Sequence, residues 1–164
     1  MARSDSFFIR ATVPIAAAYN QTNIDLGSFV DALGKTVMRI HNVSVTYGSL
    51  GSVPITPAAN AAVAAFQLTT QSQTALVGPS NRSTISSGSL LVAGNAAGDM
   101  TVLAESLDIA PQEWTGGYLV AVESIFLGAN LTLASLVDEV TVVLECTVET
   151  MTAAASMALA LSQQ

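Results

Sequence analysis

The chain has 164 residues, of which 51% are hydrophobic and only 10% are charged, and its formal net charge is −7. This length suits one domain with a core of its own. An acidic surface repels phosphate, so direct nucleic-acid binding is not expected, and a single cysteine excludes an internal disulfide.

The small charged share has two explanations. Globular chains usually carry charge on about a quarter of their residues, so copies of this chain could cover much of its surface. Alternatively, the abundant Ser, Thr, Asn and Gln residues supply the polarity. The sequence contains neither a secretory signal nor an apolar run of about 18 residues, so we expect no membrane-spanning helix.

The first strand follows a short polar arm, residues 1–6. Apolar residues alternate with others from Phe7 to Val13, which predicts a strand that Pro14 ends or confines to a sheet edge. Residues 16–23 are predicted to form a loop. The segment 23–35 is ambiguous, because Ser28 and Asp31 resemble a helix capping box, whereas Gly27 and Gly34 suit turns in an extended segment.

A second strand is predicted over 36–47. Met38 and Ile40 share one phase of its alternation, and Val43 begins the opposite phase. A β-bulge at His41–Asn42 would bring both sets to one face. His41 is the sole histidine, so we interpret it as a bulge or surface residue rather than a ligand or base.

The middle of the chain reads as short strands between turns. Residues 48–57 form a predicted loop, and the alanine-rich segment 58–73 favours a strand over a helix. A turn at 78–82 precedes a strand over 83–94, in which Gly88 suits a bulge. A turn over 94–99 and a further strand from Met100 to Glu105 follow.

The next segment contains the only tryptophan. Residues 107–117 are predicted to form a loop that Trp114 anchors on the core. Residues 118–128 read as one strand, apolar on both faces, that is buried on both sides or lies in a subunit contact. A loop over 129–138 then leads to the clearest element of the chain.

That element is a long strand over 137–151. Alternate residues are apolar, and the residues between them include Glu145, Thr147 and Glu149. Since the run is much longer than a usual strand, we expect a bend, a bulge or an end that reaches a neighbour. The two carboxylates are interpreted as a solvated face, with calcium binding as the lesser alternative. The predicted core residues are Val140, Val142, Leu144, Cys146 and Val148.

The chain ends in an alanine-rich segment, 152–164, without charge. It predicts a short helix, which needs a docking surface because a helix of this length is marginal alone. Either it frays, or it packs on a neighbouring subunit. About eight strands separated by turns, with no amphipathic helix between them, predict an antiparallel sandwich or a closed barrel.

No pattern typical of an active site is present. His41 has no second histidine to complete a zinc site, and Cys146 falls on the apolar side of a strand. No P-loop, dinucleotide fingerprint or nucleophile elbow occurs. We therefore expect no catalytic residue, no metal, no cofactor and no enzymatic activity.

Three segments together resemble the single jelly-roll coat proteins of small icosahedral viruses. They are NIDLGSFVDALGKTVMRIHNVSVTY, GGYLVAVESIFLGANLTL and VDEVTVVLECTVETMT, at 23–47, 116–133 and 137–152. The resemblance implies an all-β fold over 1–164, an antiparallel eight-stranded jelly-roll sandwich with a short C-terminal helix or tail. It also implies a capsid subunit in the virion, with no catalytic site, that self-assembles into an icosahedral shell with copies of itself and possibly other coat proteins.

One departure from the resemblance concerns the genome. Many such coat proteins hold nucleic acid with a basic N-terminal arm, which this chain lacks, so another protein or an internal membrane would face the genome. For a coat subunit we expect contacts at Phe7, Phe8, Tyr118, Ala153, Met157 and Leu161. Two alternatives stay open: a β-sandwich module that binds a glycan or host surface through Trp114 and Tyr47, and a non-viral filament or sheath subunit.

Overall fold

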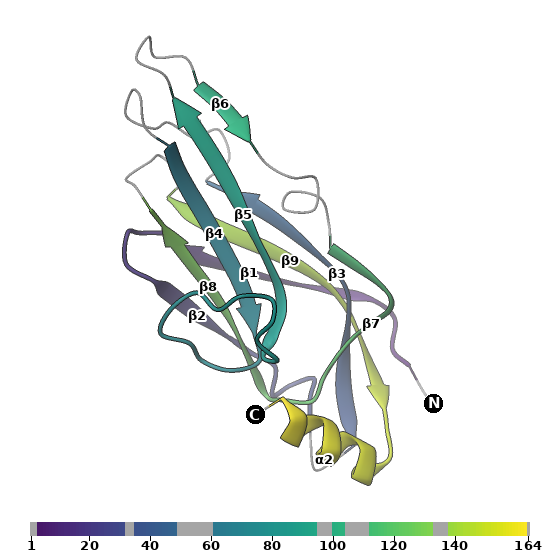
Figure 1. Cartoon of the computed structure of the whole chain (residues 1–164). Helices are drawn as coiled ribbons and strands as arrows, with labels where there is room; N and C mark the ends of the chain where they lie inside the picture. The colour runs from purple at the N-terminus through teal and green to yellow at the C-terminus, as the bar shows by residue number, and fades with distance from the viewer. Residues whose placement is uncertain are drawn as a thin grey trace.

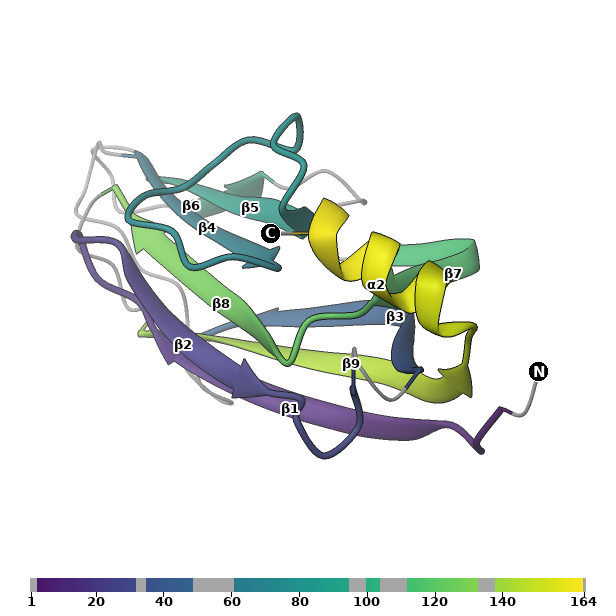
Figure 2. The ribbon, with the colours of Figure 1, turned by 90° about the horizontal axis from the view of Figure 1, so that it is seen from below.

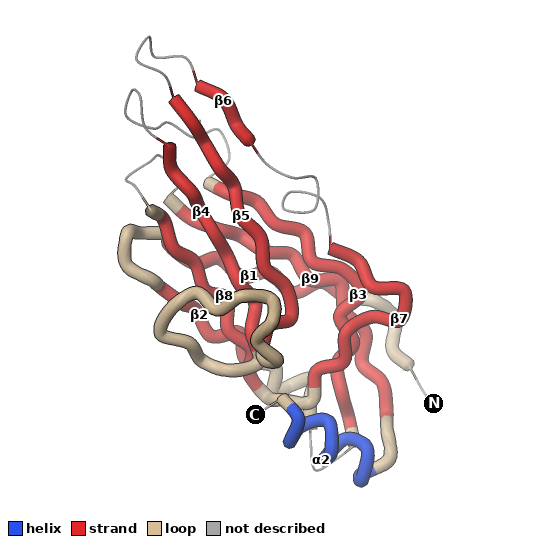
Figure 3. Tube along the Cα trace, in the orientation of Figure 1, coloured by secondary structure: helices blue, strands red, loops and turns tan. Residues whose placement is uncertain are grey.

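A computed structural model describes residues 3–31, 35–48, 61–94, 100–103, 112–132 and 138–163. Almost all of the regular structure within these ranges is β-strand (Figures 1 and 3). The elements are β1 (Phe7–Pro14), β2 (Asn20–Asp25), β3 (Thr36–Tyr47), β4 (Ala61–Thr69), β5 (Thr84–Gly94), β6 (Met100–Leu103), β7 (Gln112–Val120), β8 (Ser124–Leu131), β9 (Glu139–Thr150) and the helix α2 (Ala153–Ser162).

The strands form two antiparallel sheets that face each other (Figure 2). The first, here called the β9 sheet, has the order β1-β9-β3-β7; the second, the β8 sheet, has the order β2-β8-β4-β5-β6. Most connections cross from one sheet to the other, and the first and last strands are neighbours, which is jelly-roll topology. The predicted all-β jelly-roll sandwich is confirmed; β6 is an addition that extends the edge of the β8 sheet through the end of β5.

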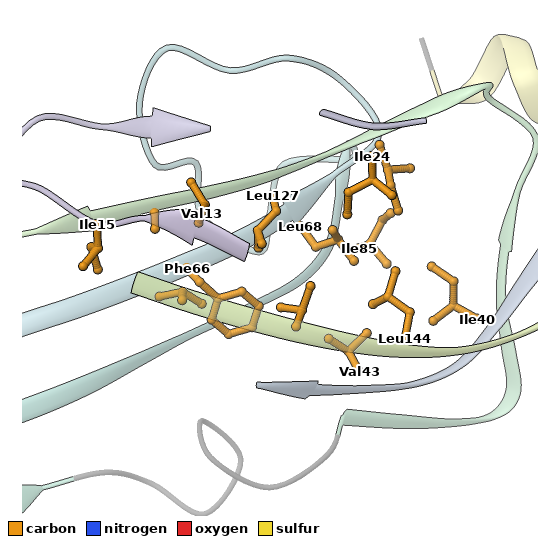
Figure 4. Close-up of a cluster of buried hydrophobic side chains, with 14 of the residues drawn as sticks. Val13, Ile15, Ile24, Ile40, Val43, Phe66, Leu68, Ile85, Leu127 and Leu144 are labelled. Carbon is orange, nitrogen blue, oxygen red and sulfur yellow. The ribbon is translucent and has the colours of Figure 1, made fainter. Parts of the chain in front are cut away.

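The strand β9 supplies the core of its sheet, as the alternation predicts. It pairs with β1 on one side and with β3 on the other. Val140, Val142, Leu144 and Cys146 are all completely buried, whereas Val148 is only half-buried. In Figure 4, Leu144 points into the space between the sheets, where side chains of the β8 sheet such as Phe66 and Leu127 meet it.

The predicted bulge in β3 is confirmed. The register of β3 against both β7 and β9 shifts between Ile40 and Asn42, and in the pairing with β9 His41 is the additional residue. Because of this shift, Ile40 and Val43 face the same core and are fully buried. The bulge predicted at Gly88 is wrong, because that residue pairs in register with Phe66. The irregularity of this strand pair lies between Leu68 and Thr69 of β4, opposite the start of β5.

A strand replaces part of the loop predicted at 16–23. The strand β2 pairs with β8 over its whole length, yet only Ile24 of its six residues is buried. Such a polar edge strand has no apolar alternation to identify it, because the hydrogen bonds to its neighbour define it. The residues after it form a turn rather than a capped helix, with the Asp25 carboxylate accepting from the Gly27 amide at 2.9 Å.

The single strand predicted over 118–128 is also wrong. The chain leaves the β9 sheet after Val120 and enters the β8 sheet at Ser124, so the segment belongs to two strands in different sheets. Both alternating sets of residues in this segment are apolar because the end of β7 and the start of β8 each bury side chains against the same core. Trp114 lies within β7 and not in a loop, in the stretch between Glu113 and Tyr118 where the register of β7 with β3 shifts. The loops predicted at 49–57, 95–99 and 107–111 lie outside the described residues.

Leu144 provides a test of the core. We expect Leu144→Ala to lower the free energy of unfolding by about 2–5 kcal/mol, because the substitution leaves a cavity at the centre of the sandwich. Val143→Ala is the matched control, since Val143 is only half-buried on the opposite face of the same strand. Urea denaturation of both variants measures the difference; equal midpoints for the two would contradict this position for Leu144.

Candidate functional site

The expected subunit contacts divide into exposed and inward-facing residues. Phe8 and Leu161 are the most exposed large apolar side chains among the described residues, at 56% and 65%, and Met157 and Ala153 are exposed as well. Phe7 instead faces the core side of β1 and stacks on Phe29 with ring centroids 4.8 Å apart. The role of each of these residues in contacts between subunits stays a prediction.

Tyr118 is likewise half-buried. Its ring packs against the main core and lies 6.0 Å from the ring of Trp114. Burial raises the pKa of the Tyr118 hydroxyl. Tyr118 therefore offers less free surface to a partner than the exposed residues of α2 do.

The predicted C-terminal helix is present and docks on its own chain. Thr152 caps it by accepting a hydrogen bond from the Ala155 amide at 3.3 Å. Ser156 and Ala160 are its buried residues, and Ala160 packs with Val37 and Ala121 in a second apolar cluster. Figure 2 shows α2 lying alongside β7 and β3, outside the sandwich.

Gln163 fixes the end of this helix. Its side-chain oxygen accepts from the Ala121 amide at 2.9 Å, and its side-chain nitrogen donates to the Leu119 carbonyl at 2.6 Å. Thr70 donates to the Gln163 carbonyl at 2.8 Å. The buried side chain of Gln163 therefore satisfies one backbone group of β7 and one of the connection between β7 and β8, a role that composition alone does not indicate. The opposite face of α2, with Met157 and Leu161, stays exposed.

A polar cluster covers one end of the outer face of the β9 sheet. Its central pair is Arg39 and Glu149, where Nε of the guanidinium donates to one carboxylate oxygen at 3.1 Å and Nη2 contacts the other. Arg39 also donates to the carbonyl of Gly116, and it passes so close to Gly117, at φ +70°, that a side chain there would collide with it.

The cluster corrects the prediction of a solvated face on β9. Glu149 is 8% exposed and Thr147 is 4% exposed, because side chains of β3 and of the N-terminal arm cover them. Both carboxylate oxygens of Glu149 are bonded to Arg39, and the Glu145 carboxylate accepts from Asn42 at 3.0 Å. These carboxylates are therefore used within the sheet, and they do not converge as calcium ligands would.

His41 belongs to the same cluster. Nη2 of Arg3 lies 2.6 Å from Nε2 of His41, and Nε of Arg3 donates to the Thr147 hydroxyl at 3.1 Å. The Thr147 hydroxyl lies 3.0 Å from the same imidazole nitrogen. Because a guanidinium only donates, Nε2 of His41 must be the acceptor, so the imidazole is neutral in this arrangement.

The described part of the N-terminal arm is attached to β9. The Ser4 amide donates to the Val148 carbonyl at 2.9 Å, and the Val148 amide donates to the Ser4 hydroxyl at 2.9 Å. Arg3 forms an isolated β-bridge with Glu149. Backbone pairing with β9 therefore orders part of the arm that was predicted from its polarity. The residue types of the arm do not indicate this pairing.

Cys146 lies beneath this cluster on the core side. Burial, with a smaller contribution from Glu145, raises the pKa of its thiol to about 12. The thiol is therefore protonated at neutral pH and poorly nucleophilic. Its predicted position as a small core residue is confirmed, since it is completely buried.

An open cavity of about 820 Å³ lies at the edge of the sandwich beside Trp114. We call it the Trp114 cavity; it is lined by residues of β4 and β5, of the connection between them, and of the start of β7. Sequence reasoning did not find it, since its lining comes from four separate segments. Tyr47 does not contribute: its ring faces the core and meets the edge of Phe66, with centroids 6.1 Å apart.

Within the described ranges, no three His, Cys, Asp or Glu side chains lie close enough together to hold a metal ion. No helix among them is long and apolar enough to cross a membrane. The sequence matches no protein-family model. No curated protein matches it either.

The His41 contacts predict a pH dependence of stability. Burial and then Arg3 lower the pKa of His41 below its ordinary value of 6.5; Arg39 acts in the same direction, while Glu145 and Glu149 oppose it. Since the unfolded chain then takes up the proton first, the contribution of His41 is complete above about pH 6.5 and is lost as the pH falls toward the lowered pKa.

Unfolding curves between about pH 8 and pH 5 measure this dependence. The His41→Gln variant keeps a polar side chain but has no titrating group, so its stability should fall less over this range than that of the natural chain. Both proteins share the same carboxylates, and the difference between them isolates His41. Superimposable pH profiles would contradict the contact between Arg3 and the neutral imidazole.

Gln163 predicts a second effect. We expect Gln163→Ala to lower the free energy of unfolding by about 1–3 kcal/mol, because it leaves the Ala121 amide and the Leu119 carbonyl without these partners. Hydrogen exchange of the α2 amides should also become faster. Ser162→Ala, at an exposed position of the same helix, is the control, and equal exchange rates in the two variants would disprove the anchoring role.

Proposed function

We propose that this chain is a structural subunit of a virus capsid, one that self-assembles into an icosahedral shell. The observation that supports this most strongly is the order of strands in the two sheets, which is the order of the jelly roll that the resemblance to coat proteins implies. The three segments that carry the resemblance correspond to β3 with the turn before it, to much of β7 with β8, and to β9.

The distribution of exposed apolar side chains supports assembly independently. Phe8 lies on β1, and Met157 and Leu161 lie on α2. A shell needs different patches of one copy to meet complementary patches of the next. Residues 151–164 carry no charge, so acidic copies can meet at α2 without bringing like charges together.

The N-terminal arm supports a particular version of this proposal. Arg3 is bonded to His41 and Thr147, and the whole chain is acidic, so the arm has little capacity to neutralise phosphate. In the proposed shell, a second coat protein or an internal membrane would face the genome. The subunit itself would act through contacts between copies.

Particle formation tests the proposal directly. We expect the purified chain to form large particles in light scattering and closed spheres in negative-stain electron microscopy. Fibres would favour the filament or sheath alternative instead. A monodisperse monomer that persists at high concentration would contradict assembly by the chain alone.

The exposed face of α2 predicts which variant prevents assembly. Leu161→Glu places a charge on the most exposed apolar side chain of the helix, so we expect it to abolish large particles while circular dichroism and melting temperature stay close to those of the natural chain. Ser80→Glu adds the same charge at an exposed turn of another segment and is the matched control. Full assembly of Leu161→Glu would remove α2 from the interface.

A further inference from the structure

The Trp114 cavity is built from segments that the fold holds together. The Gln112 side chain accepts from the Ser86 hydroxyl and donates to the Ser87 carbonyl at 2.9 Å, which ties the start of β7 to β5. On the other side of β5, the side chain of Gln67 holds the connection between β4 and β5, accepting from the Val77 amide at 2.6 Å. These contacts make the lining a preformed surface rather than a gap between loops.

The size and the apolar part of the lining suit a small ligand. A volume of about 820 Å³ falls within the usual range of ligand pockets. Trp114 is half-buried, so part of its indole ring is free to meet a ligand. Leu76, which is 41% exposed, and Pro79 contribute apolar surface from the connection between β4 and β5.

The polar part of the lining consists mainly of hydroxyl groups. Thr84, Ser86, Ser87 and Ser89 all belong to β5, and Gly88 between them leaves the strand backbone uncovered by a side chain. Among the described residues of the lining there is no Lys, Arg or His, and Glu113 is the only charged one. An anionic ligand would therefore meet a carboxylate and no compensating cation, in a chain that already carries a net charge of −7.

We propose that the Trp114 cavity binds a short neutral carbohydrate. A pyranose ring combines an apolar face, formed by its C–H groups, with a rim of hydroxyls that both donate and accept hydrogen bonds. The indole of Trp114 matches the first, and the hydroxyls of the half-buried Ser87 and Ser89 match the second, whereas Ser86 is 3% exposed and donates to Gln112. The site lies at the sandwich edge and does not depend on assembly, so it can serve a coat subunit or a free domain.

A proline-rich peptide is the other ligand that aromatic grooves commonly accept. Such grooves present several aromatic rings, since the polyproline helix offers few hydrogen bonds. Here Phe66 also lines the cavity, but it is only 1% exposed, so Trp114 is the one described residue that presents an aromatic face. The many hydroxyls beside it favour the carbohydrate.

Tryptophan fluorescence gives a direct test, because Trp114 is the only tryptophan of the chain. The natural chain is titrated with neutral disaccharides (chitobiose, lactose, maltose and cellobiose), with sialyllactose and with an oligoproline peptide. We expect a saturable change in emission with at least one neutral sugar, and binding of sialyllactose at least about tenfold weaker than that of the best neutral sugar.

Calorimetric titration of variants locates the site. Trp114→Ala should weaken binding of the best sugar about tenfold or more. Ser87→Arg should do the same by occupying the cavity, and it keeps the proposal testable if Trp114→Ala fails to fold, because Ser87 is only half-buried. Phe8→Ala, on β1 at the opposite edge of the β9 sheet from β7, should bind the sugar like the natural chain.

Three results would overturn the proposal: no neutral sugar binds, the oligoproline peptide or sialyllactose binds more tightly than every neutral sugar, or Ser87→Arg binds as the natural chain does. None of these results affects the assembly test. If the chain forms particles but binds no sugar, the carbohydrate site is disproved and the capsid role stands. If the chain binds a sugar but stays a monomer, the capsid role is disproved and the carbohydrate site stands.

Discussion

The fold depends on the burial of one face of β9 between two neighbours. The strand pairs with β1 and β3 along its length, so the first and last strands of the domain meet in one sheet. Val140, Val142, Leu144 and Cys146 are fully buried against the β8 sheet, and together they account for on the order of 10 kcal/mol of hydrophobic stabilisation. Because β9 lies between β1 and β3, the β9 sheet is continuous only with this last strand in place.

The opposite face of β9 uses polar contacts in place of apolar burial. Glu149 is paired with Arg39, Glu145 accepts from Asn42, and Thr147 contacts both Arg3 and His41. These contacts attach the N-terminal arm to the sheet and occupy the carboxylates that could otherwise have suggested a metal site. The bulge at His41 is what places this imidazole beside Thr147 while Ile40 and Val43 remain in the core.

The surface of the domain combines two features that the proposals use separately. The uncharged outer face of α2 is held at a fixed position by Gln163, so it is a preformed contact patch for the proposed capsid role. The Trp114 cavity lies elsewhere, where the edges of the two sheets approach each other. A jelly roll leaves such edges open because its two sheets do not close into a continuous barrel.

The sequence by itself determined the elements that have one buried face. The alternation in β1, in β3 and in β9 predicted these strands, the bulge at His41–Asn42 and the burial of Cys146, and the alanine-rich terminus predicted α2. Each of these signals is local, since burial on one side of a regular element repeats with the period of that element. The three segments that resemble coat proteins added the expectation of jelly-roll topology.

Only the tertiary structure decided the features that need distant partners. The strand β2 has few buried residues and is defined by its hydrogen bonds to β8. The segment after Tyr118 divides between two sheets because the chain passes from the β9 sheet to the β8 sheet between Val120 and Ser124. The burial of Glu149, the role of Gln163 and the Trp114 cavity likewise arise from residues far apart in sequence. No local periodicity in the sequence indicates such pairings, because they stabilise the fold only when both partners, which are distant in sequence, are in contact.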